Sequence, residues 1–364
     1  MRTIRTAIIG TGSIAQAHFN AVHSLAPRIE VVAALDIAAD RLNEFCDENK
    51  IARRYSDLAA LLEKEKPDLV QICTPPGTHC ELSVQCLRAG AWVLCEKPLC
   101  GSLAEMDRIE AAEKETGCYC SSVFQMRFGS AGRHVRSLIE SNAMGQPLLA
   151  ICHTTWYRGL DYYGVPWRGK WQTELGGPTM GLGIHSIDFL LWLMGDWRDV
   201  RATMGTLDRP IEVEDLSLAT VRFENGAHGS IVNSALSPRQ ETYLRLDFQK
   251  STVELRTLYG HSNADWHFSV AKNSPHQAEL EQWKAIPTDV RTSHAAQLTA
   301  LLDSMHRHER PLTSGREARR TIEFLTALYK SAITGETVRR GSIQKGDPFY
   351  DKLHGPVSGR PKWA

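Results

Sequence analysis

Short apolar runs alternate with amphipathic stretches over the first 124 residues, and this alternation limits the possible folds more than any other feature of the chain. The apolar runs have the length of strands, and the stretches between them have helical spacing. Parallel strands need crossover connections, and these are normally helices. The pattern therefore predicts a doubly wound parallel sheet with helices on both faces. The expected strands are residues 4–10, 30–35, 68–74, 91–95 and 118–124.

The pattern changes after residue 145. Longer runs that read as strands appear at 148–158, 216–223, 243–248 and 266–270, and Glu224-Asn225-Gly226 has the composition of a hairpin turn. We expect a C-terminal α+β domain with a mostly antiparallel open sheet, followed by helices over about 293–308 and 315–334.

The domain boundaries follow from this change. We expect one domain over residues 1–124, a second over 125–340, and a tail over 341–364 that is rich in Gly, Pro and Lys. The tail is expected either to be poorly ordered or to contact a neighbouring subunit.

The charge balance narrows the choice of partners. Lys and Arg total 42 and Asp and Glu total 42, so no general field attracts nucleic acid or anionic lipid. The apolar stretch 189–194 is far shorter than the roughly 20 residues of a membrane-spanning helix. We expect a cytoplasmic protein with a small-molecule partner. The nine cysteines form no CxxC pair, which predicts reduced and mostly buried thiols.

A glycine-rich turn follows the first expected strand and precedes an expected helix. Gly10-Thr11-Gly12-Ser13-Ile14-Ala15 matches the pattern in which a helix N-terminus binds a pyrophosphate. Asp36 ends the second strand, where a carboxylate binds the ribose hydroxyls of an adenosine and repels a 2′-phosphate. These features predict a Rossmann domain that prefers NAD. NADP stays open, because Arg41 is close enough in sequence to neutralise a 2′-phosphate.

Two further segments leave strands at the carboxyl edge of the predicted sheet, where open α/β sheets bind ligands. The segment 74–79 reads TPPGTH, and Glu96-Lys97-Pro98 follows the fifth strand. A lysine there can hydrogen-bond a substrate hydroxyl and stabilise the alkoxide that forms as a hydride leaves its carbon. A solvated lysine would be the ordinary interpretation of Lys97 taken alone.

These segments, in this order, resemble the Gfo/Idh/MocA oxidoreductases. The matching runs are AIIGTGSIA, ICTPPGTHCE, CEKPL, FQMRF at 124–128 and GGPTMGLGIHSIDFLLWLMG. The resemblance implies an NAD(P)-binding domain and a C-terminal domain whose open sheet forms homodimers or homotetramers. It also implies a cis Lys97-Pro98 bond and a cofactor site made of Gly10, Gly12, Ser13, Ile14, Asp36, Thr74, Pro75, His79, Glu96 and Lys97. We expect Thr11, Arg41 and Gln125 to contribute to the same site.

A second family signature is present with one departure. Members commonly have Asp-x-Gly-x-His, whereas this chain has Gly181-Leu182-Gly183-Ile184-His185. His185 is the expected general base, because an imidazole titrates near neutral pH. Since glycine cannot replace the missing carboxylate, either another side chain or water does so, or the protein is not an ordinary dehydrogenase. Lys97 and His185 are thus the expected catalytic residues.

Aromatic and cationic residues before this signature suggest a substrate wall, since rings stack on sugars and arginines bind hydroxyls or carboxylates. Packing at a domain interface is the competing interpretation. Arg127 could instead form an interdomain salt bridge, and Asp188 could brace the His185 helix. We expect no metal site, because the remaining histidines, His18 and His294 among them, read as scattered surface or capping groups. The predicted substrate contacts are Arg127, Trp156, Tyr157, Trp167, Arg168 and Asp188.

The sequence favours an NAD-dependent oxidoreductase that moves a hydride between nicotinamide and a secondary hydroxyl or ketone of a sugar, sugar derivative or polyol. Two alternatives stay open. One is an NAD-dependent glycosidase that oxidises a sugar ring transiently, and the other is a sensor that binds NAD(P) without catalysis. Gly181 favours the sensor, whereas Glu96, Lys97 and His185 oppose it.

Overall fold

The computed structural model describes residues 2–363, and the chain divides into two compact units. The first unit comprises the chain up to Val123 together with His294–Arg319. The second comprises Phe124–Ser293 and the chain from Arg320 onward. The second unit is therefore not one continuous stretch of the chain, because His294–Arg319 belongs to the first unit.

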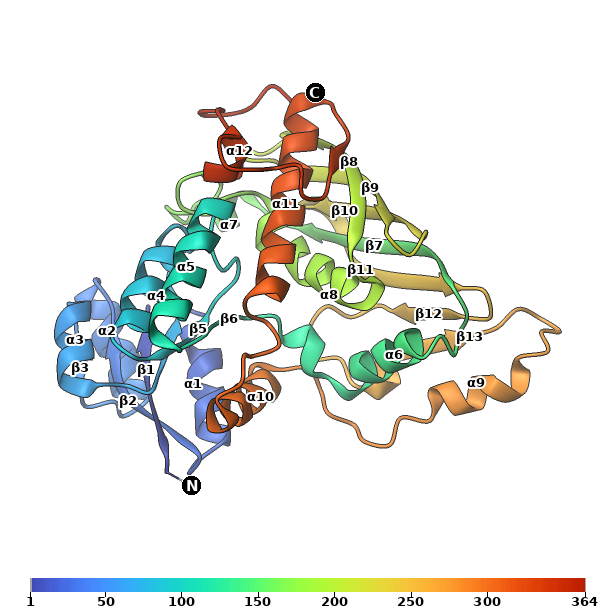
Figure 1. The fold of residues 1–364 in the computed structure, drawn as a ribbon. Coiled ribbons are helices and arrows are strands. Elements are labelled where there is room, and N and C mark those ends of the chain that lie inside the picture. Colours follow the sequence, from blue (N-terminus) through green and yellow to red (C-terminus); the bar gives the residue numbers. More distant parts are fainter. Residues whose placement is uncertain (1, 364) are drawn as a thin grey trace. The chain divides into compact units, whose positions relative to one another are not determined.

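The first unit is built on a parallel sheet of six strands in the order β3-β2-β1-β4-β5-β6 (Figure 1). This is the doubly wound sheet that the sequence predicts. Every residue of β4 and β5 is buried, as expected for strands covered on both faces. The strands are β1 (Ile4–Ile9), β2 (Ile29–Leu35), β3 (Arg54–Tyr55), β4 (Leu69–Ile72), β5 (Trp92–Cys95) and β6 (Cys120–Ser122).

Helices connect these strands, and two of them begin at a side chain that caps the first turn. Asp57 accepts a hydrogen bond from the Ala60 amide at the start of α3, and Ser102 caps α5 in the same way through the Glu105 amide. The helices and the short 3₁₀ turn are α1 (Ala15–Ser24), α2 (Ala39–Glu48), α3 (Leu58–Glu65), η1 (Pro76–Thr78), α4 (His79–Arg88) and α5 (Leu103–Thr116).

Helix α10 (His294–Arg307) joins the first unit because of its apolar face. Leu298, Leu301 and Leu302 are buried in one cluster with Ile4 and Trp92 from the sheet. Burying this apolar surface lowers the free energy by more than the entropic cost of bringing together segments that are far apart in sequence. The sequence pattern shows the amphipathic helix but not the core that it joins.

The second unit is built on an eight-stranded mixed sheet in the order β13-β12-β11-β7-β10-β9-β8-β14. The pairing is antiparallel except between β7 and β10. This agrees with the predicted, mostly antiparallel sheet, and Asn225-Gly226 forms the turn between β9 and β10. The strands are β7 (Pro147–Tyr157), β8 (Trp197–Gly205), β9 (Leu216–Phe223), β10 (His228–Ser234), β11 (Leu236–Phe248), β12 (Thr252–Leu255), β13 (Trp266–Ser269) and β14 (Val338–Arg339).

Buried and exposed residues alternate along β8 and β9, so one face of this sheet is covered and the other is open. Helix α8 (Ile184–Met194), which carries His185, is buried along its whole length. The other helical elements are η2 (Gln125–Phe128), α6 (Ser130–Glu140), α7 (Leu160–Tyr163), the π-helical turn η3 (Thr179–Gly183), η4 (Asn263–Asp265), α9 (Gln277–Lys284), α11 (Arg316–Thr334) and α12 (Pro348–Asp351).

The C-terminal tail packs on the second unit, so it is not poorly ordered, whereas the alternative expectation of a contact with a neighbouring subunit stays a prediction. The Trp171 indole donates a hydrogen bond to the Gly359 carbonyl at 2.9 Å, and the Arg360 guanidinium donates to the Arg209 carbonyl at 2.8 Å. Indole and guanidinium groups offer donors that the backbone of a glycine-rich segment accepts.

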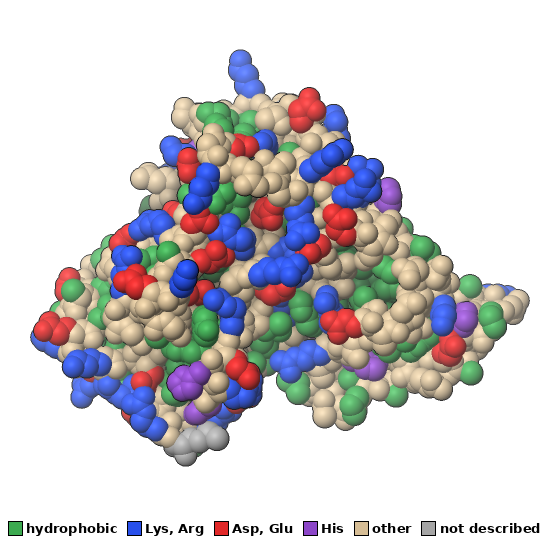
Figure 2. Space-filling view, viewed as in Figure 1, with side chains coloured by type: hydrophobic (Ala, Val, Ile, Leu, Met, Phe, Trp, Pro, Cys, Tyr) green, Lys and Arg blue, Asp and Glu red, His purple; other side chains and the backbone are tan. Residues whose placement is uncertain are grey.

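The surface agrees with the balanced charge of the sequence. On the face drawn in Figure 2, Lys and Arg side chains are interspersed with Asp and Glu side chains. No helix within residues 2–363 has the length and apolar character needed to cross a membrane. All nine cysteines are free thiols, and eight of them are buried.

Candidate active site

The turn between β1 and α1 has the geometry that a bound pyrophosphate requires. Gly10 has φ +86°, and a Cβ there would lie 2.9 Å from the Cys73 carbonyl carbon and oxygen, so only glycine fits. A Cβ at Gly12 would meet no atom within 4 Å, and Ser13 and Ile14 are exposed. No side chain caps the start of α1. The helix N-terminus can therefore approach an anion.

Asp36 is fixed at the end of β2 by several hydrogen bonds. The Thr11 amide and hydroxyl donate to its Oδ2 at 2.8 and 3.0 Å, and the Ala38 amide donates to Oδ1 at 2.9 Å. Arg41 donates to both oxygens, at 2.6 and 3.0 Å. Burial alone would raise the pKa of Asp36, but Arg41 and the amides lower it to about 2, so the carboxylate is charged.

Arg41 bears on the choice of cofactor. Its side chain is 51% exposed and forks onto the carboxylate that ribose hydroxyls would bind. Arg41 must move for both hydroxyls to reach Asp36, and its exposure gives it room to do so. Close to Asp36, it is also positioned to neutralise a 2′-phosphate.

His79 is buried between two loops of the first unit. Its Nδ1 lies 2.7 Å from the Pro98 carbonyl oxygen, and its Nε2 lies 2.8 Å from that of Thr74. Burial lowers the pKa of His79. Both ring nitrogens lie within hydrogen-bond distance of backbone oxygens, and the neutral ring that burial favours donates to one of them. His79 thus helps to position the loops after β4 and β5, and its expected cofactor contact stays a prediction.

Lys97 follows the end of β5 and is partly exposed. Its amide donates to Glu96 Oε2 at 3.2 Å, and the Lys97-Pro98 bond is cis, as the family resemblance implies. Thr74 and Pro75 follow β4, the neighbouring strand in the sheet. The structure thus places these three residues at the same edge as the glycine-rich turn.

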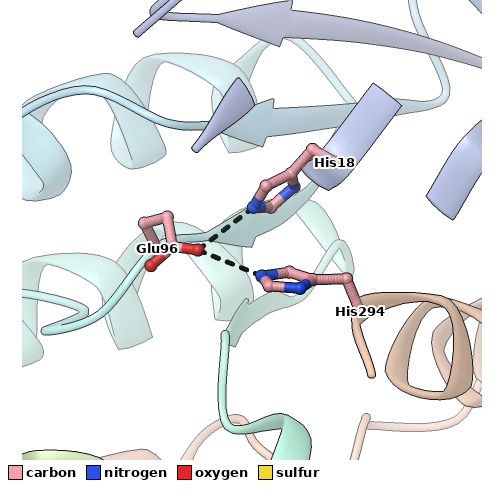
Figure 3. A group of neighbouring side chains, drawn as sticks. All are labelled: His18, Glu96 and His294. Atoms are coloured by element: carbon pink, nitrogen blue, oxygen red, sulfur yellow. Dashed lines mark hydrogen bonds and ion pairs between the residues drawn. The ribbon is translucent and has the colours of Figure 1, made fainter. Parts of the chain in front are cut away.

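Glu96 is held by two histidines (Figure 3). Its Oε1 lies 3.2 Å from His18 Nε2 and 3.4 Å from His294 Nε2, and His18 Nδ1 lies 2.8 Å from Gln71 Oε1. Burial opposes charge on this carboxylate, but the two ring hydrogen bonds hold the pKa of Glu96 well below its usual range. Burial likewise favours a neutral His18 ring, but Cys73 and Glu96 raise the pKa of His18 well above its ordinary value.

This cluster corrects the expectation that His18 and His294 are scattered surface or capping groups. His18 is fully buried in α1, and His294 comes from the first turn of α10. The ligand atoms of the three residues lie within 4.8 Å of one another, a spacing that could hold a metal ion. As hydrogen-bond donors, the two rings satisfy the carboxylate without one.

His185 lies near the start of α8 in the second unit and is 3% exposed. Its ring packs edge-on against Tyr259, with centroids 5.2 Å apart, and Tyr259 packs in the same way on Trp156 at 6.0 Å. Two residues from the predicted site are thus joined by Tyr259, which no sequence pattern indicates.

Glu214 anchors the chain that leads into α8. It accepts hydrogen bonds from the Gly177 and Thr179 amides at 3.0 and 3.1 Å and from the Tyr329 hydroxyl at 2.9 Å. Burial raises the pKa of Glu214 to about 7. Sequence reasoning missed Glu214, because a single glutamate before a strand carries no pattern.

Arg127 and Asp188 form a buried ion pair, which corrects their prediction as substrate contacts. Both have 0% exposure, and the guanidinium donates to the two carboxylate oxygens at 2.8 and 2.6 Å. The Thr321 hydroxyl adds a third hydrogen bond at 2.8 Å. Burial raises the pKa of Asp188, although Arg127 opposes this shift. Both residues lie within the second unit, so the pair stabilises that unit internally.

The remaining predicted residues of the second unit differ in exposure. Gln125 is buried, whereas Tyr157 is 46% exposed with the Arg209 guanidinium 5.2 Å from its ring centroid. Trp156 is partly exposed, and its indole donates to the Thr242 hydroxyl at 3.0 Å. The Arg168 guanidinium lies 4.3 Å from the ring centroid of Trp167.

Two family models match the chain. Residues 4–124 match the model of an oxidoreductase family with an NAD-binding Rossmann fold, and residues 133–254 match the GFO/IDH/MocA C-terminal domain. The chain belongs to the Gfo/Idh/MocA oxidoreductase family. The first unit is therefore an NAD-binding Rossmann domain, which confirms the predicted cofactor.

Named relatives match a large part of the chain. D-apiose dehydrogenase from Paraburkholderia graminis is 26% identical, over 96% of this chain and 92% of its own. Myo-inositol 2-dehydrogenase from Thermotoga maritima is 28% identical, over 64% of this chain and 68% of its own. The WlbA dehydrogenase from Bordetella pertussis, solved with NADH and UDP-GlcNAcA, is 27% identical with a TM-score of 0.83 and covers 93% of this chain and 98% of its own.

Substitutions at Asp36 and Arg41 test the cofactor preference. We expect Asp36→Ala to weaken NADH binding about 10- to 100-fold, since hydrogen bonds to a charged group contribute about 1.5–3 kcal/mol, and to relax discrimination against NADPH. Arg41→Ala should weaken NADPH but leave NADH unchanged or tighter, because it frees Asp36. Fluorescence titration with both cofactors measures this. Equal losses of NADH binding in both variants would contradict the assignment.

Glu96→Gln tests the charge of the histidine cluster. Because its pKa is lowered, ionised Glu96 stabilises the fold above the ordinary carboxyl pKa, and this stabilisation is lost as pH falls. Because its pKa is raised, protonated His18 stabilises the fold below the ordinary imidazole pKa, and this stabilisation is lost as pH rises through the raised value. The destabilisation by Glu96→Gln should therefore be largest between the ordinary carboxyl and imidazole pKa values, in mildly acidic solution, and reach up to about 3–5 kcal/mol for a broken buried pair. Thermal unfolding across the pH range measures it, and a difference independent of pH would argue against a charged pair.

Proposed function

We propose that the protein is an NAD-dependent dehydrogenase that acts on a secondary hydroxyl of a sugar, sugar derivative or polyol, or reduces the corresponding ketone. The observation that carries this proposal is the position of Lys97, fixed beside buried Glu96 at the same sheet edge as the NAD-binding turn. Ligands of open α/β sheets bind at this edge.

Lys97 and His185 have separate roles in the proposed oxidation of the hydroxyl. The Lys97 ammonium donates a hydrogen bond to the substrate hydroxyl and stabilises negative charge on its oxygen. His185 accepts the hydroxyl proton, since a neutral imidazole is a base near neutral pH. Bound NAD supplies the acceptor for the hydride from the adjacent carbon. Buried Glu96 keeps the backbone at Lys97 in place through the Lys97 amide.

The substrate class is supported by side chains of the second unit and by the relatives. Trp156, Tyr157 and Trp167 are not fully buried, and aromatic rings stack on the apolar faces of sugars. The names of the relatives specify apiose, myo-inositol and a UDP-linked sugar acid, which all carry secondary hydroxyls.

The open face of the eight-stranded sheet suits self-association into a dimer or tetramer. Leu149 and Leu218 are 37% and 44% exposed on neighbouring parts of this sheet, and apolar side chains on an open sheet favour burial against a second copy. A cytoplasmic location accompanies this proposal, because the cofactor and the reduced thiols suit that compartment.

The test uses NAD and NADH with inositols, hexoses, pentoses, uronates, their keto forms and simple glycosides. We expect stoichiometric NADH formation with one substrate class. Lys97→Ala should lower turnover by about 10²–10⁴-fold, the range of a lost acid–base group, while NADH binding stays largely intact. Lys114→Ala, which removes an exposed lysine from α5 of the same unit, is the matched control.

Other outcomes point elsewhere. Sugar release without net NADH formation would indicate a glycosidase. Tight NAD binding without turnover of any substrate would favour a sensor. An undiminished rate in Lys97→Ala would show that the proposed mechanism is wrong.

A further inference from the structure

The helix that carries His185 has no carboxylate at position 181, yet a carboxylate lies next to that position. A Cβ at Gly181 would lie 3.6 Å from Glu174 Oε1. Apart from the neighbouring residues and the backbone of the same helix, no other atom of the described chain would lie within 4 Å of it. Gly181 is partly exposed and lies about one helical turn before His185. Residues so spaced share a face. Glu174 therefore brings a carboxylate from the preceding loop to this face.

Glu174 is held firmly in this place. It is 4% exposed, and its Oε1 accepts a hydrogen bond from Arg168 at 2.9 Å while its Oε2 accepts one from the Gly169 amide. Arg168 is fixed in turn, since its guanidinium lies 3.7 and 4.3 Å from the ring centroids of Tyr162 and Trp167. A carboxylate oxygen has two acceptor positions, so Oε1 can accept a further hydrogen bond while it is paired with Arg168.

We propose that Glu174 orients the substrate by accepting a hydrogen bond from a sugar hydroxyl on the His185 face, and that Gly181 leaves the space that this carboxylate needs. The inference rests on the proposed function, because it takes a sugar as the ligand. It also assigns Arg168 as a positioning residue that holds Glu174, where the sequence suggested a direct substrate contact.

The same geometry accounts for the departure from the family signature. An aspartate at 181 would carry its carboxylate one bond beyond a Cβ that lies 3.6 Å from Glu174 Oε1, and like charges so close together repel in a partly buried site. Glycine at 181 therefore accompanies a carboxylate that is supplied by Glu174. An aspartate at 181 without Glu174 would be the alternative arrangement.

A double-mutant cycle tests the proposal on the full-length protein with its best sugar from the panel. We expect Glu174→Ala to lower kcat/KM about 10- to 100-fold, the loss of a hydrogen bond to a charged group. Gly181→Asp alone should also lower it, because two carboxylates then compete. The combination Glu174→Ala with Gly181→Asp should recover at least about tenfold over Glu174→Ala, since the helix then supplies the carboxylate.

The controls separate substrate orientation from loop structure. Glu212→Ala removes a nearby half-buried carboxylate that accepts from the Trp171 amide, and it should change kcat/KM little. NADH affinity should be the same in every folded variant. If Glu174→Ala does not fold, Glu174→Gln repeats the cycle at nearly constant volume. Recovery of activity by an aspartate at 181 is not expected of a glutamate that only tethers the loop.

Two outcomes keep this inference distinct from the proposed function. If the wild type is active and the effects of Glu174→Ala and Gly181→Asp simply multiply, the assignment of Glu174 is wrong and the dehydrogenase stands. If the wild type turns over no sugar, the proposed function fails, and this inference fails with it.

Discussion

The buried carboxylate of Glu96 is the interaction on which the first unit's site depends. His18 reaches it from α1, which begins at the cofactor turn, and His294 reaches it from α10. Glu96 itself immediately precedes Lys97. One carboxylate thus fixes three elements that are remote in sequence. A buried unpaired charge raises the free energy of the folded state, so ionised Glu96 favours a fold in which α1 and α10 keep their histidines next to it.

In the second unit, the carboxylate that is absent at position 181 has a counterpart in Glu174, which lies beside that position. The family signature places a carboxylate on the His185 helix, and its absence suggests a lost activity. In three dimensions, the Glu174 carboxylate lies 3.6 Å from the place where that side chain would start. Glu214, held by the Tyr329 hydroxyl, binds the backbone just before α8 and so fixes where this face of the helix lies. The chemistry of a site therefore depends on where charges lie and not on which segment supplies them.

The features that sequence predicted well are those with a local cause. Strand and helix periodicity gave the parallel sheet, and the glycine-rich turn with Asp36 gave the cofactor, because each pattern reflects contacts within a few dozen residues. The cis Lys97-Pro98 bond came from the family resemblance and is present. By contrast, the membership of α10 in the first unit depends on a core formed by distant residues.

The errors share another cause, which is that sequence does not reveal burial. Arg127 and Asp188 have the chemistry of substrate contacts, but they are fully buried and satisfy each other. His18 and His294 have no common spacing, so only the fold could bring them to Glu96.

The proposed reaction transfers a hydride directly from a sugar carbon to NAD. It is tested most directly with the active sugar deuterated at the carbon that bears the oxidised hydroxyl, followed by analysis of the NADH produced. The account predicts one deuterium at C4 of the nicotinamide and a slower single turnover than with the unlabelled sugar. NADH without deuterium, formed in water from the labelled sugar, would contradict it.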